Sequence, residues 1–332
     1  MNVTVMSDGA WGTAIALTLL NNDHHVTMWG PFPDYLEKMR VERVNSRFLP
    51  GIELPSELAF AADPGEAIAG TELVVMAAPT QYVRGAANLL AAAALDPTVP
   101  IVNVAKGIEL GTLKRISEII ADELGNNPYL ALAGPSHAEE VAKRVPTAVV
   151  AAAHDRALAK RVQTAFLTPN FRVYTSPDPV GVELGGALKN VYAIAAGICD
   201  GMQLGDNPKA ALITRGIAEM ARLGNALGGH PETFAGLAGV GDMIVTCTSG
   251  HSRNRHVGEE LGRGKTLDQV TAAMGMVVAE GVKTAQSAFE LAREVGVETP
   301  IIHNVYAALY EDKDPRAVVR DLMERDPKGE FE

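Results

Sequence analysis

The first half of the chain alternates between short apolar runs and segments with helical periodicity, and this alternation constrains the fold more than any other feature. Repeated βα units of this kind build a doubly wound, largely parallel sheet with helices packed against it. The sequence therefore predicts an α/β fold for this half. The runs predicted to be strands are residues 2–6, 26–29, 72–77, 100–104, 129–133, 147–152 and 171–174.

The alternation stops at the Ser-Pro-Asp-Pro segment of residues 176–179. Beyond it the sequence shows only helical periodicity, interrupted by glycine and proline. We therefore expect two domains, a sheet domain over residues 1–176 and an all-helical domain over residues 177–332, with 325–332 as a frayed polar tail. The predicted helices of the second domain are 180–202, 207–227, 252–261, 278–295, 300–310 and 315–324.

A glycine-containing turn, Ser7-Asp8-Gly9-Ala10-Trp11-Gly12, directly follows the first strand and opens the first helix. In a Rossmann domain this turn holds the pyrophosphate of a dinucleotide, because the backbone comes close and the helix N-terminus faces the negative charge. Gly9 and Gly12 match the second and third glycines of that motif, whereas Ser7 replaces the first. Taken alone, the turn is equally consistent with an ordinary βα connection; its position favours a Rossmann-type dinucleotide site.

The end of the second predicted strand, Met28-Trp29-Gly30-Pro31-Phe32, leaves the choice of cofactor open. An acidic residue near this position binds the ribose of NAD, and an arginine accommodates the 2′-phosphate of NADP. The segment contains neither. Both NAD and NADP stay open, and any contact with a 2′-phosphate has to come from elsewhere in the chain.

Lys189 lies within the long apolar helix predicted over residues 180–202. Burial disfavours the charged form of lysine and lowers its pKa, which suits the side chain to general acid/base catalysis near neutral pH. The alternative, more common for a lone lysine, is a side chain that extends its amine to water. The adjacent Asn190, and the polar segments Gly239–Asp242 and Ser252–Arg255, favour the catalytic interpretation.

The bulk composition excludes several classes of function. A net charge of −11 and a pI near 5.3 argue against nucleic acid or an anionic membrane as the main partner. The apolar runs are too short to span a bilayer, and the eight histidines show no metal-ligand spacing. Cys199 and Cys247 lie in apolar contexts and are expected to be small core residues of a cytoplasmic protein.

Several segments, in order along almost the whole chain, resemble the bacterial-type NAD(P)-dependent glycerol-3-phosphate dehydrogenase family. The Leu-Gly-Gly-Ala-Leu-Lys-Asn and Ser-Arg-Asn-Arg elements are the most specific. The resemblance implies a helical domain like that of 6-phosphogluconate dehydrogenase, interconversion of sn-glycerol 3-phosphate and dihydroxyacetone phosphate, and a supply for phospholipid synthesis; it leaves a homodimer open. The matching segments are Gly9–Ala14, Asn45–Gly51, Ala105–Glu109, Ala133–Glu140, Gly181–Asn190, Gly205–Gly216, Gly236–Asp242 and Thr246–Arg255.

The same resemblance implies roles for individual residues. Lys189 matches the proton acceptor, and three departures occur: Ser7 replaces a glycine, His137 a phenylalanine, and Pro31 an often polar residue near the adenosine. Substrate contacts are implied for Lys106, Gly134, Ser136, Lys189, Asp242, Ser252, Arg253 and Asn254. Cofactor contacts are implied for Gly9, Ala10, Trp11, Lys106, Ala138, Arg253, Val278 and Glu280.

The residue types suit this chemistry. Oxidising a secondary alcohol needs a base for the hydroxyl and a nicotinamide to accept hydride. Lys106 would stabilise the developing negative charge and depress the pKa of Lys189 by repulsion. Asp242 would orient a lysine amine or accept from a substrate hydroxyl; the alternative is a helix cap. Arg253 at a helix start suits a phosphate dianion, whereas Arg255 is expected to lie on a solvated surface.

Two other functions stay open. One is a related β-hydroxyacid or sugar-phosphate dehydrogenase with the same fold, against which the Ser-Arg-Asn-Arg element argues. The other is a nucleotide-binding sensor that has lost turnover, suggested only by Ser7 and Pro31. The presence of four residues favours the enzyme: Lys106, Lys189, Asp242 and Arg253.

Overall fold

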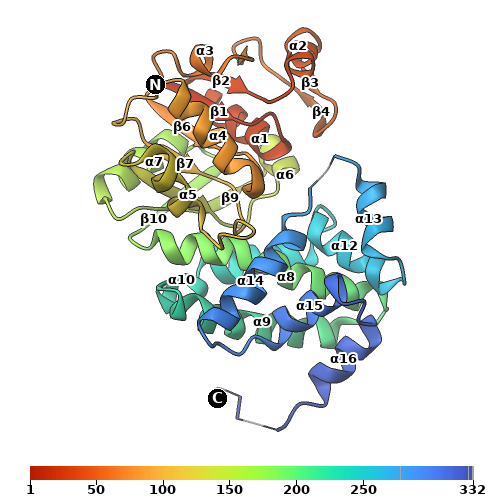
Figure 1. The fold of residues 1–332 in the computed structure, drawn as a ribbon. Coiled ribbons are helices and arrows are strands. Elements are labelled where there is room, and N and C mark those ends of the chain that lie inside the picture. Colours follow the sequence, from red (N-terminus) through yellow and green to blue (C-terminus); the bar gives the residue numbers. More distant parts are fainter. Residues whose placement is uncertain (277, 328, 331–332) are drawn as a thin grey trace.

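A computed structural model describes residues 1–276, 278–327 and 329–330. Figure 1 shows the sheet domain above and the helical domain below, with helix α8 (Pro179–Gly201) at the junction between them. Strand β10 (Phe171–Ser176) is the last strand before α8. The division into residues 1–176 and 177–332 stays a prediction, since part of the second range lies outside the described residues.

The sheet domain is built on eight strands in the order β10-β9-β8-β7-β6-β1-β2-β5. Neighbouring strands are parallel except for the antiparallel pair β8 and β9. The predicted doubly wound, largely parallel sheet is therefore confirmed. The remaining seven strands are β1 Asn2–Met6, β2 His25–Trp29, β5 Ala59–Ala61, β6 Leu73–Met76, β7 Ile101–Asn103, β8 Tyr129–Ala133 and β9 Thr147–Ala152.

Alternate residues of the central strands face two separate apolar layers, as expected for a sheet covered on both sides. In β6, Leu73 and Val75 join the layer under helices α1, α6 and α7, whereas Val74 and Met76 join the layer under α3, α4 and α5. The helices of this domain are α1 Ala10–Leu20, α2 Pro33–Glu42, α3 Pro64–Ile68, α4 Thr80–Ala92, α5 Ile116–Leu124, α6 Ala138–Ala142 and α7 Arg156–Phe166.

The strand order reverses beside β1. From β1 the chain proceeds outward to β2 and β5, then returns to β6 on the other side of β1. In open α/β sheets, ligands bind at the carboxyl ends of the strands at such a reversal. A short antiparallel pair that the sequence did not predict, β3 (Val44–Asn45) and β4 (Leu49–Glu53), also lies in this domain.

Helix α8 is the centre of the helical domain and is apolar on nearly every side, which is typical of a helix surrounded by others. Glycine lets α12 (Arg253–Gly262) approach it closely, because a Cβ added at Gly258 would collide with the carbonyl oxygen of Ile194. The other helices are α9 Asp206–Ala226, α10 Pro231–Phe234, α11 Asp242–Thr248, α13 Leu267–Met274, α14 Glu280–Glu294, α15 Pro300–Tyr310 and α16 Pro315–Met323.

The sequence predicted the long helices to within a few residues but missed the short ones, α10, α11, α13 and a π-helical turn at Leu237–Gly241.

The predicted tail over 325–332 is described only in part. There, Arg325 pairs with Glu298, and the Arg215 guanidinium donates to the carbonyl oxygen of Glu330. Residues 328, 331 and 332 lie outside the described residues.

Candidate active site

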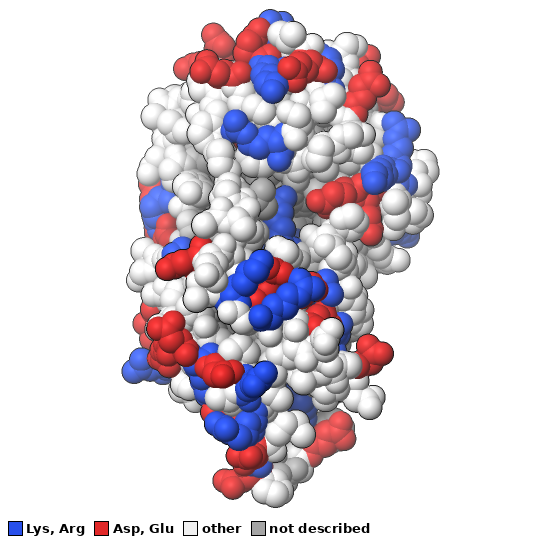
Figure 2. Space-filling model, turned by 90° about the vertical axis from the view of Figure 1, so that its right-hand side faces the viewer, with Lys and Arg blue, Asp and Glu red and all other residues white. Residues whose placement is uncertain are grey.

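A cavity of about 220 Å³ lies at the carboxyl ends of the central strands and is lined by both domains. The sheet domain contributes the glycine turn after β1 and the segments after β6, β7 and β8; the helical domain contributes α8, α11, the start of α12 and the segment before α14. Figure 2 shows a hollow between the two domains with basic side chains at its bottom. The cavity therefore coincides with the reversal of strand order.

One carboxylate joins two lysines in this site. Asp242 Oδ1 accepts a hydrogen bond from Lys189 Nζ at 2.7 Å, and Asp242 Oδ2 accepts one from Lys106 Nζ at 2.6 Å. Both lysines line the cavity, and Asp242 is 1% exposed. The alternative interpretation, that Asp242 caps a helix, is therefore wrong: both of its carboxylate oxygens accept hydrogen bonds from the lysines.

The electrostatics of these three groups are tightly coupled. Burial lowers the pKa of Lys106 to about 8; the attraction of Asp242 opposes this shift and repulsion from Lys189 adds to it. Burial alone would raise the pKa of Asp242, but the charges of Lys106 and Lys189 hold it below its usual range. These shifts favour the anionic form of Asp242 and make Lys106 easier to deprotonate than an ordinary lysine.

Thr246 is a member of the site that the sequence reasoning missed. Lys189 Nζ donates a second hydrogen bond to Thr246 Oγ1 at 2.7 Å. Thr246 Oγ1 donates in turn to the carbonyl oxygen of Asp242, one helical turn earlier in α11. The four-residue spacing from Asp242 was the available signal, but it requires knowing that residues 242–248 form a helix.

Lys106 is also held from the sheet domain. Its Nζ donates to the carbonyl oxygen of Gly134 at 2.9 Å and lies 3.5 Å from Ser136 Oγ. A Cβ at residue 134 would come within 2.9 Å of the Val149 backbone, and its φ is +147°, so glycine is required there. Lys106, Gly134 and Ser136, all predicted substrate contacts, thus lie together.

The start of α12 brings Ser252, Arg253 and Asn254 to the cavity. Ser252 Oγ caps the helix by accepting from the Arg255 N–H at 3.2 Å. Asn254 links three helices: its Nδ2 donates to Asn190 Oδ1 at 2.9 Å, and its Oδ1 accepts from the Gly281 N–H at 2.8 Å. Asn254 therefore positions its neighbours with both ends of its amide.

Arg253 differs from these neighbours. It is half-buried and lines the cavity, and within the described residues no hydrogen bond or ion pair holds its guanidinium. An unpaired cation at a helix N-terminus is suited to an anionic ligand group.

The expectation for Arg255 was wrong. Its side chain is only 19% exposed, and its Nε donates to Asp200 Oδ2 at 2.6 Å. Asp200 stands near the end of α8 and also pairs with Lys209. Because α12 packs so closely on α8, Arg255 faces this carboxylate instead of water, and the ion pair compensates for its partial burial.

The glycine turn is organised around Ser7. Its φ of +154° is uncommon for a residue other than glycine, and its Oγ accepts a hydrogen bond from the Gly9 N–H at 3.1 Å. A Cβ at Gly12 would approach the carbonyl oxygen of Ser7 to 2.5 Å, so helix α1 needs glycine there. The serine hydroxyl has thus become part of the turn.

The remaining predicted cofactor residues line the same cavity. Gly9, Ala10, Trp11, Ala138, Val278 and Glu280 lie there with Lys106 and Arg253. The start of α1 carries no side-chain cap, which leaves its N–H groups available to a phosphate, and the buried Trp11 Nε1 has no partner within the described residues. These features fit a dinucleotide.

Two further cavity residues have notable partners. Glu280 Oε1 accepts from the Thr80 N–H at 2.6 Å, which fixes α14 to the segment after β6, and burial raises its pKa. His137, one of the departures from the family pattern, lies 5.8 Å from the ring of His251. Burial lowers the pKa of His137, and repulsion from Lys189 adds to this effect, so its ring favours the neutral form.

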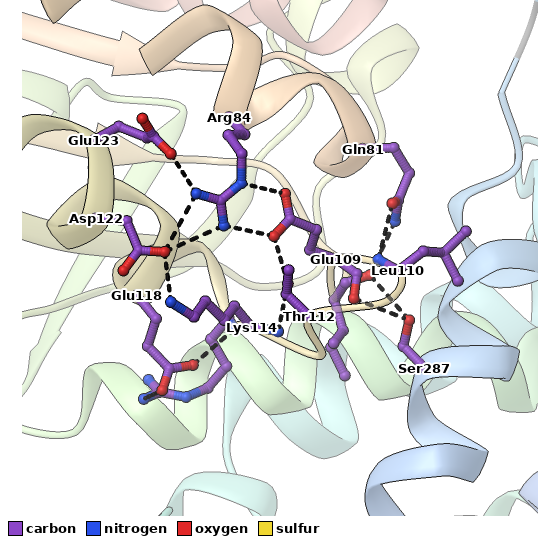
Figure 3. A network of polar contacts seen from close by, with 12 residues as sticks. Gln81, Arg84, Glu109, Leu110, Thr112, Lys114, Glu118, Asp122, Glu123 and Ser287 are labelled. Atoms are coloured by element: carbon purple, nitrogen blue, oxygen red, sulfur yellow. Dashed lines mark hydrogen bonds and ion pairs between the residues drawn. The ribbon is translucent and has the colours of Figure 1, made fainter. Parts of the chain in front are cut away.

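A polar network fixes the loop that carries Lys106 (Figure 3). Arg84 of α4 donates to both oxygens of Glu109, at 2.9 and 2.7 Å, and also contacts Asp122 and Glu123. Ser287 of α14 lies 3.3 Å from the carbonyl oxygen of Glu109. The loop is thus bound to both domains, which restricts the position of its lysine.

Other kinds of site find no support in the described residues. Within the ranges given above, no group of three His, Cys, Asp or Glu side chains is placed to hold a metal ion. In that part of the chain no helix has the length and apolar character needed to cross a membrane. Cys199 and Cys247 are buried, as expected, and burial raises the pKa of Cys247 to about 12.

The fold and this cavity together define a class. A Rossmann-type sheet with a glycine turn at its strand reversal, facing a helical domain that supplies a buried lysine and a free arginine, is typical of dehydrogenases that use a nicotinamide dinucleotide and an anionic substrate.

Comparison with known proteins specifies the family. Residues 2–159 and 178–320 match the family models for the N- and C-terminal parts of NAD-dependent glycerol-3-phosphate dehydrogenase. The chain belongs to this family. It is 50% identical to glycerol-3-phosphate dehydrogenase [NAD(P)+] of Geobacillus kaustophilus, covering 100% of this chain and 96% of that one. With the enzyme of Geobacter sulfurreducens it shares 52% identity over 99% and 98% of the chains.

Comparison with solved structures supports the same family. The crystal structure of glycerol-3-phosphate dehydrogenase from Coxiella burnetii superposes with a TM-score of 0.94 at 37% identity, covering 98% of this chain and 99% of that chain. The yeast enzyme superposes with a TM-score of 0.83 at 27% identity. D-mandelate dehydrogenase, at 12% identity, shares only the fold.

Proposed function

We propose that this protein interconverts sn-glycerol 3-phosphate and dihydroxyacetone phosphate, with NAD or NADP as the hydride carrier and Lys189 as general acid/base. The observation that carries the proposal is the placement of two lysines on one buried carboxylate, in the cavity that also contains the glycine turn and the free Arg253. The names of the relatives at about 50% identity support the same reaction.

The cofactor, when bound, supplies the nicotinamide ring that accepts or gives hydride. Gly9, Ala10 and Trp11 would hold its pyrophosphate at the start of α1, where no side chain caps the helix, although the Gly9 N–H is already bonded to Ser7 Oγ. Ala138, Val278 and Glu280 line the same cavity and would hold the other half of the dinucleotide. Lys106 and Arg253 are accessible to cofactor and substrate alike.

In the oxidative direction, Lys189 Nζ takes the proton of the substrate hydroxyl as the carbon gives up hydride; in reduction it returns that proton to the oxygen. Asp242 and Thr246 orient this amine. Lys106 places a second cation beside the reacting oxygen, where negative charge develops. With Gly134 and Ser136 it also positions the substrate.

The phosphate of the substrate is assigned to the start of α12. Arg253 offers a planar donor fork that no group in the described part of the chain occupies, and the helix N-terminus adds further N–H groups beyond the one that Ser252 caps. Ser252 and Asn254 border the same point; Asn254 acts mainly by holding α12 against Asn190 and Gly281.

A sensor without turnover is the competing function, and the intact lysine–carboxylate arrangement disfavours it. A buried lysine and a largely buried one on a single carboxylate are costly to keep without a chemical use. We further propose a cytoplasmic location, a role in supplying glycerol 3-phosphate for phospholipid synthesis, and a homodimer as the assembly to be tested by light scattering.

The test is oxidation of NADH and of NADPH, each with dihydroxyacetone phosphate and with unphosphorylated dihydroxyacetone. We expect turnover with the phosphorylated substrate. Arg253→Ala should raise KM for dihydroxyacetone phosphate by about tenfold or more, because a charge-assisted hydrogen-bonding fork is lost, and leave KM for dihydroxyacetone nearly unchanged. Exposed Arg316→Ala is the matched control. No turnover with either cofactor refutes the function; equal effects on both substrates refute the phosphate assignment.

A further inference from the structure

The end of β2 lacks the side chain that would contact the adenosine ribose. In dinucleotide-binding Rossmann domains an acidic residue about 20 positions after the glycine motif binds the ribose 2′-hydroxyl. Here that position falls at Gly30, followed by Pro31, neither of which offers a polar side chain. Seen from β2 alone, the ribose would have no acceptor.

A carboxylate from the neighbouring strand fills that place. β1 and β2 pair in parallel with Met6 beside Trp29, so the turn after Met6 lies next to the end of β2. A Cβ added at Gly30 would lie 2.7 Å from Asp8 Cγ and 2.9 Å from Asp8 Oδ2. Asp8 thus occupies the space into which a side chain on Gly30 would extend.

Asn45 anchors the backbone of Asp8, whereas one oxygen of the Asp8 carboxylate has no partner in the described residues. Its carbonyl oxygen accepts from Asn45 Nδ2 at 2.8 Å, and Asn45 Oδ1 accepts from the Tyr35 hydroxyl at 2.7 Å. Asp8 is 4% exposed, and its Oδ2 has no hydrogen-bond partner in the described part of the chain. A buried carboxylate oxygen without a donor is costly, so a bound ligand that supplies a hydroxyl donor to Oδ2 would relieve this cost.

We infer that Asp8 accepts hydrogen bonds from the adenosine ribose hydroxyls and makes the protein prefer NAD(H) to NADP(H). The inference rests on the proposed function, since it assigns the cofactor of that reaction. Two ribose hydroxyls would satisfy the carboxylate. A 2′-phosphate would instead bring up to two negative charges against the Asp8 anion, and such juxtaposed like charges lower affinity.

Arg47 is the nearby cation that opposes this preference. Its guanidinium carbon lies 4.2 Å from the centre of the Tyr35 ring, with Phe32 and Phe48 at 5.9 and 5.8 Å. Burial raises the pKa of Asp8 above its ordinary value, and the charge of Arg47 opposes this shift. Arg47 is exposed, however, so solvent and salt screen it, whereas Asp8 is buried at the strand end. The Asp8 carboxylate therefore decides the preference.

The experiment is titration of the full-length protein with NADH and with NADPH, in the absence of substrate, for wild type, Asp8→Asn and Arg47→Ala. Asparagine keeps the size of the side chain and removes its charge. We expect wild type to bind NADH about tenfold or more tightly than NADPH, Asp8→Asn to shift this ratio at least about tenfold towards NADPH, and Arg47→Ala to preserve the preference for NADH.

A wild type that binds NADPH more tightly overturns the inference, as does an unchanged ratio in Asp8→Asn. Because asparagine still accepts a hydrogen bond, Asp8→Ala serves as a second variant, with the same expected direction. NADH binding without turnover of dihydroxyacetone phosphate would refute the proposed reaction while leaving the assignment of Asp8 standing. If neither nucleotide binds, both proposals fail.

Discussion

At the scale of single residues, Ser7 shows how the chain accommodates an unusual side chain in its phosphate turn. The serine keeps a glycine-like backbone and uses its hydroxyl to accept from the Gly9 N–H. The hydrogen bond compensates in part for the energetic cost of the positive φ. Replacing Ser7 by glycine should therefore improve cofactor binding little. We therefore predict that the turn is adapted to serine and that Ser7 does not impair it.

We predict that Ser7→Gly changes NADH affinity by less than about threefold. Relief of the positive φ is offset by the lost hydrogen bond and by the larger entropy of the unfolded chain. Ser7→Ala is the matched variant: it loses the hydroxyl but keeps the strained backbone, and should destabilise the protein by about 1 kcal/mol. NADH titration and urea unfolding measure both effects. A tenfold gain in affinity for Ser7→Gly would mean that the serine impairs the site and would revive the sensor hypothesis.

At the scale of secondary-structure elements, the close contact of α12 with α8 is what brings Arg253 near Lys189. Gly258 of α12 meets the backbone of α8 at Ile194, where no side chain fits. Both helices contribute to the cavity, α8 through Lys189 and α12 through its first turn. The distance between the proposed base, Lys189, and the proposed phosphate site at Arg253 thus depends on the glycine at position 258.

Gly258→Ala should therefore separate the helices and lower the free energy of unfolding by about 1–3 kcal/mol, as overpacking generally does. It should also reduce kcat/KM for dihydroxyacetone phosphate, since Arg253 moves with its helix. Gly250→Ala is the control, because a Cβ there meets nothing within 4 Å. Urea unfolding and steady-state kinetics on both variants check this, and equal behaviour of the two would contradict the close-packing argument.

At the scale of the whole molecule, one cluster of charges joins the two domains: Lys106 of the sheet domain pairs with Asp242 of the helical domain. The free energy of unfolding should therefore depend on pH. Burial places the pKa of Lys106 near 8, below its ordinary value of 10.5. Between these values the unfolded chain binds a proton that the folded protein does not, so this lysine makes stability rise with pH across that window.

The measurement is the free energy of unfolding of wild type minus that of Lys106→Met, from pH 7 to pH 10.5. Subtraction cancels the titration of groups that do not interact with Lys106, so the difference reports Lys106 together with its partners Asp242 and Lys189. The difference should increase as pH rises from about 8 towards 10.5. A difference that is flat, or that decreases, would show that Lys106 keeps its proton in the folded state.

Most of this architecture could be predicted from the sequence, because hydrophobic periodicity marks long elements and because a proline-rich segment separates the sheet from the helices. The details of the site could not. Thr246 enters only through a short helix that has too few residues to show periodicity, and Arg255 was misassigned because helix packing decides its exposure. Asp8 reaches the end of β2 through strand pairing, which no local pattern reveals.

We propose that Lys189 transfers the proton in the reaction that takes place in this cavity. The most direct test is reduction of dihydroxyacetone phosphate by Lys189→Ala and Lys189→Met, with NADH binding measured on the same preparations and exposed Lys160→Ala as control. We predict that kcat falls about 10²–10⁴-fold in both Lys189 variants, while NADH affinity stays within about threefold and the control retains full turnover. A Lys189 variant that binds NADH and keeps most of its turnover would contradict the account.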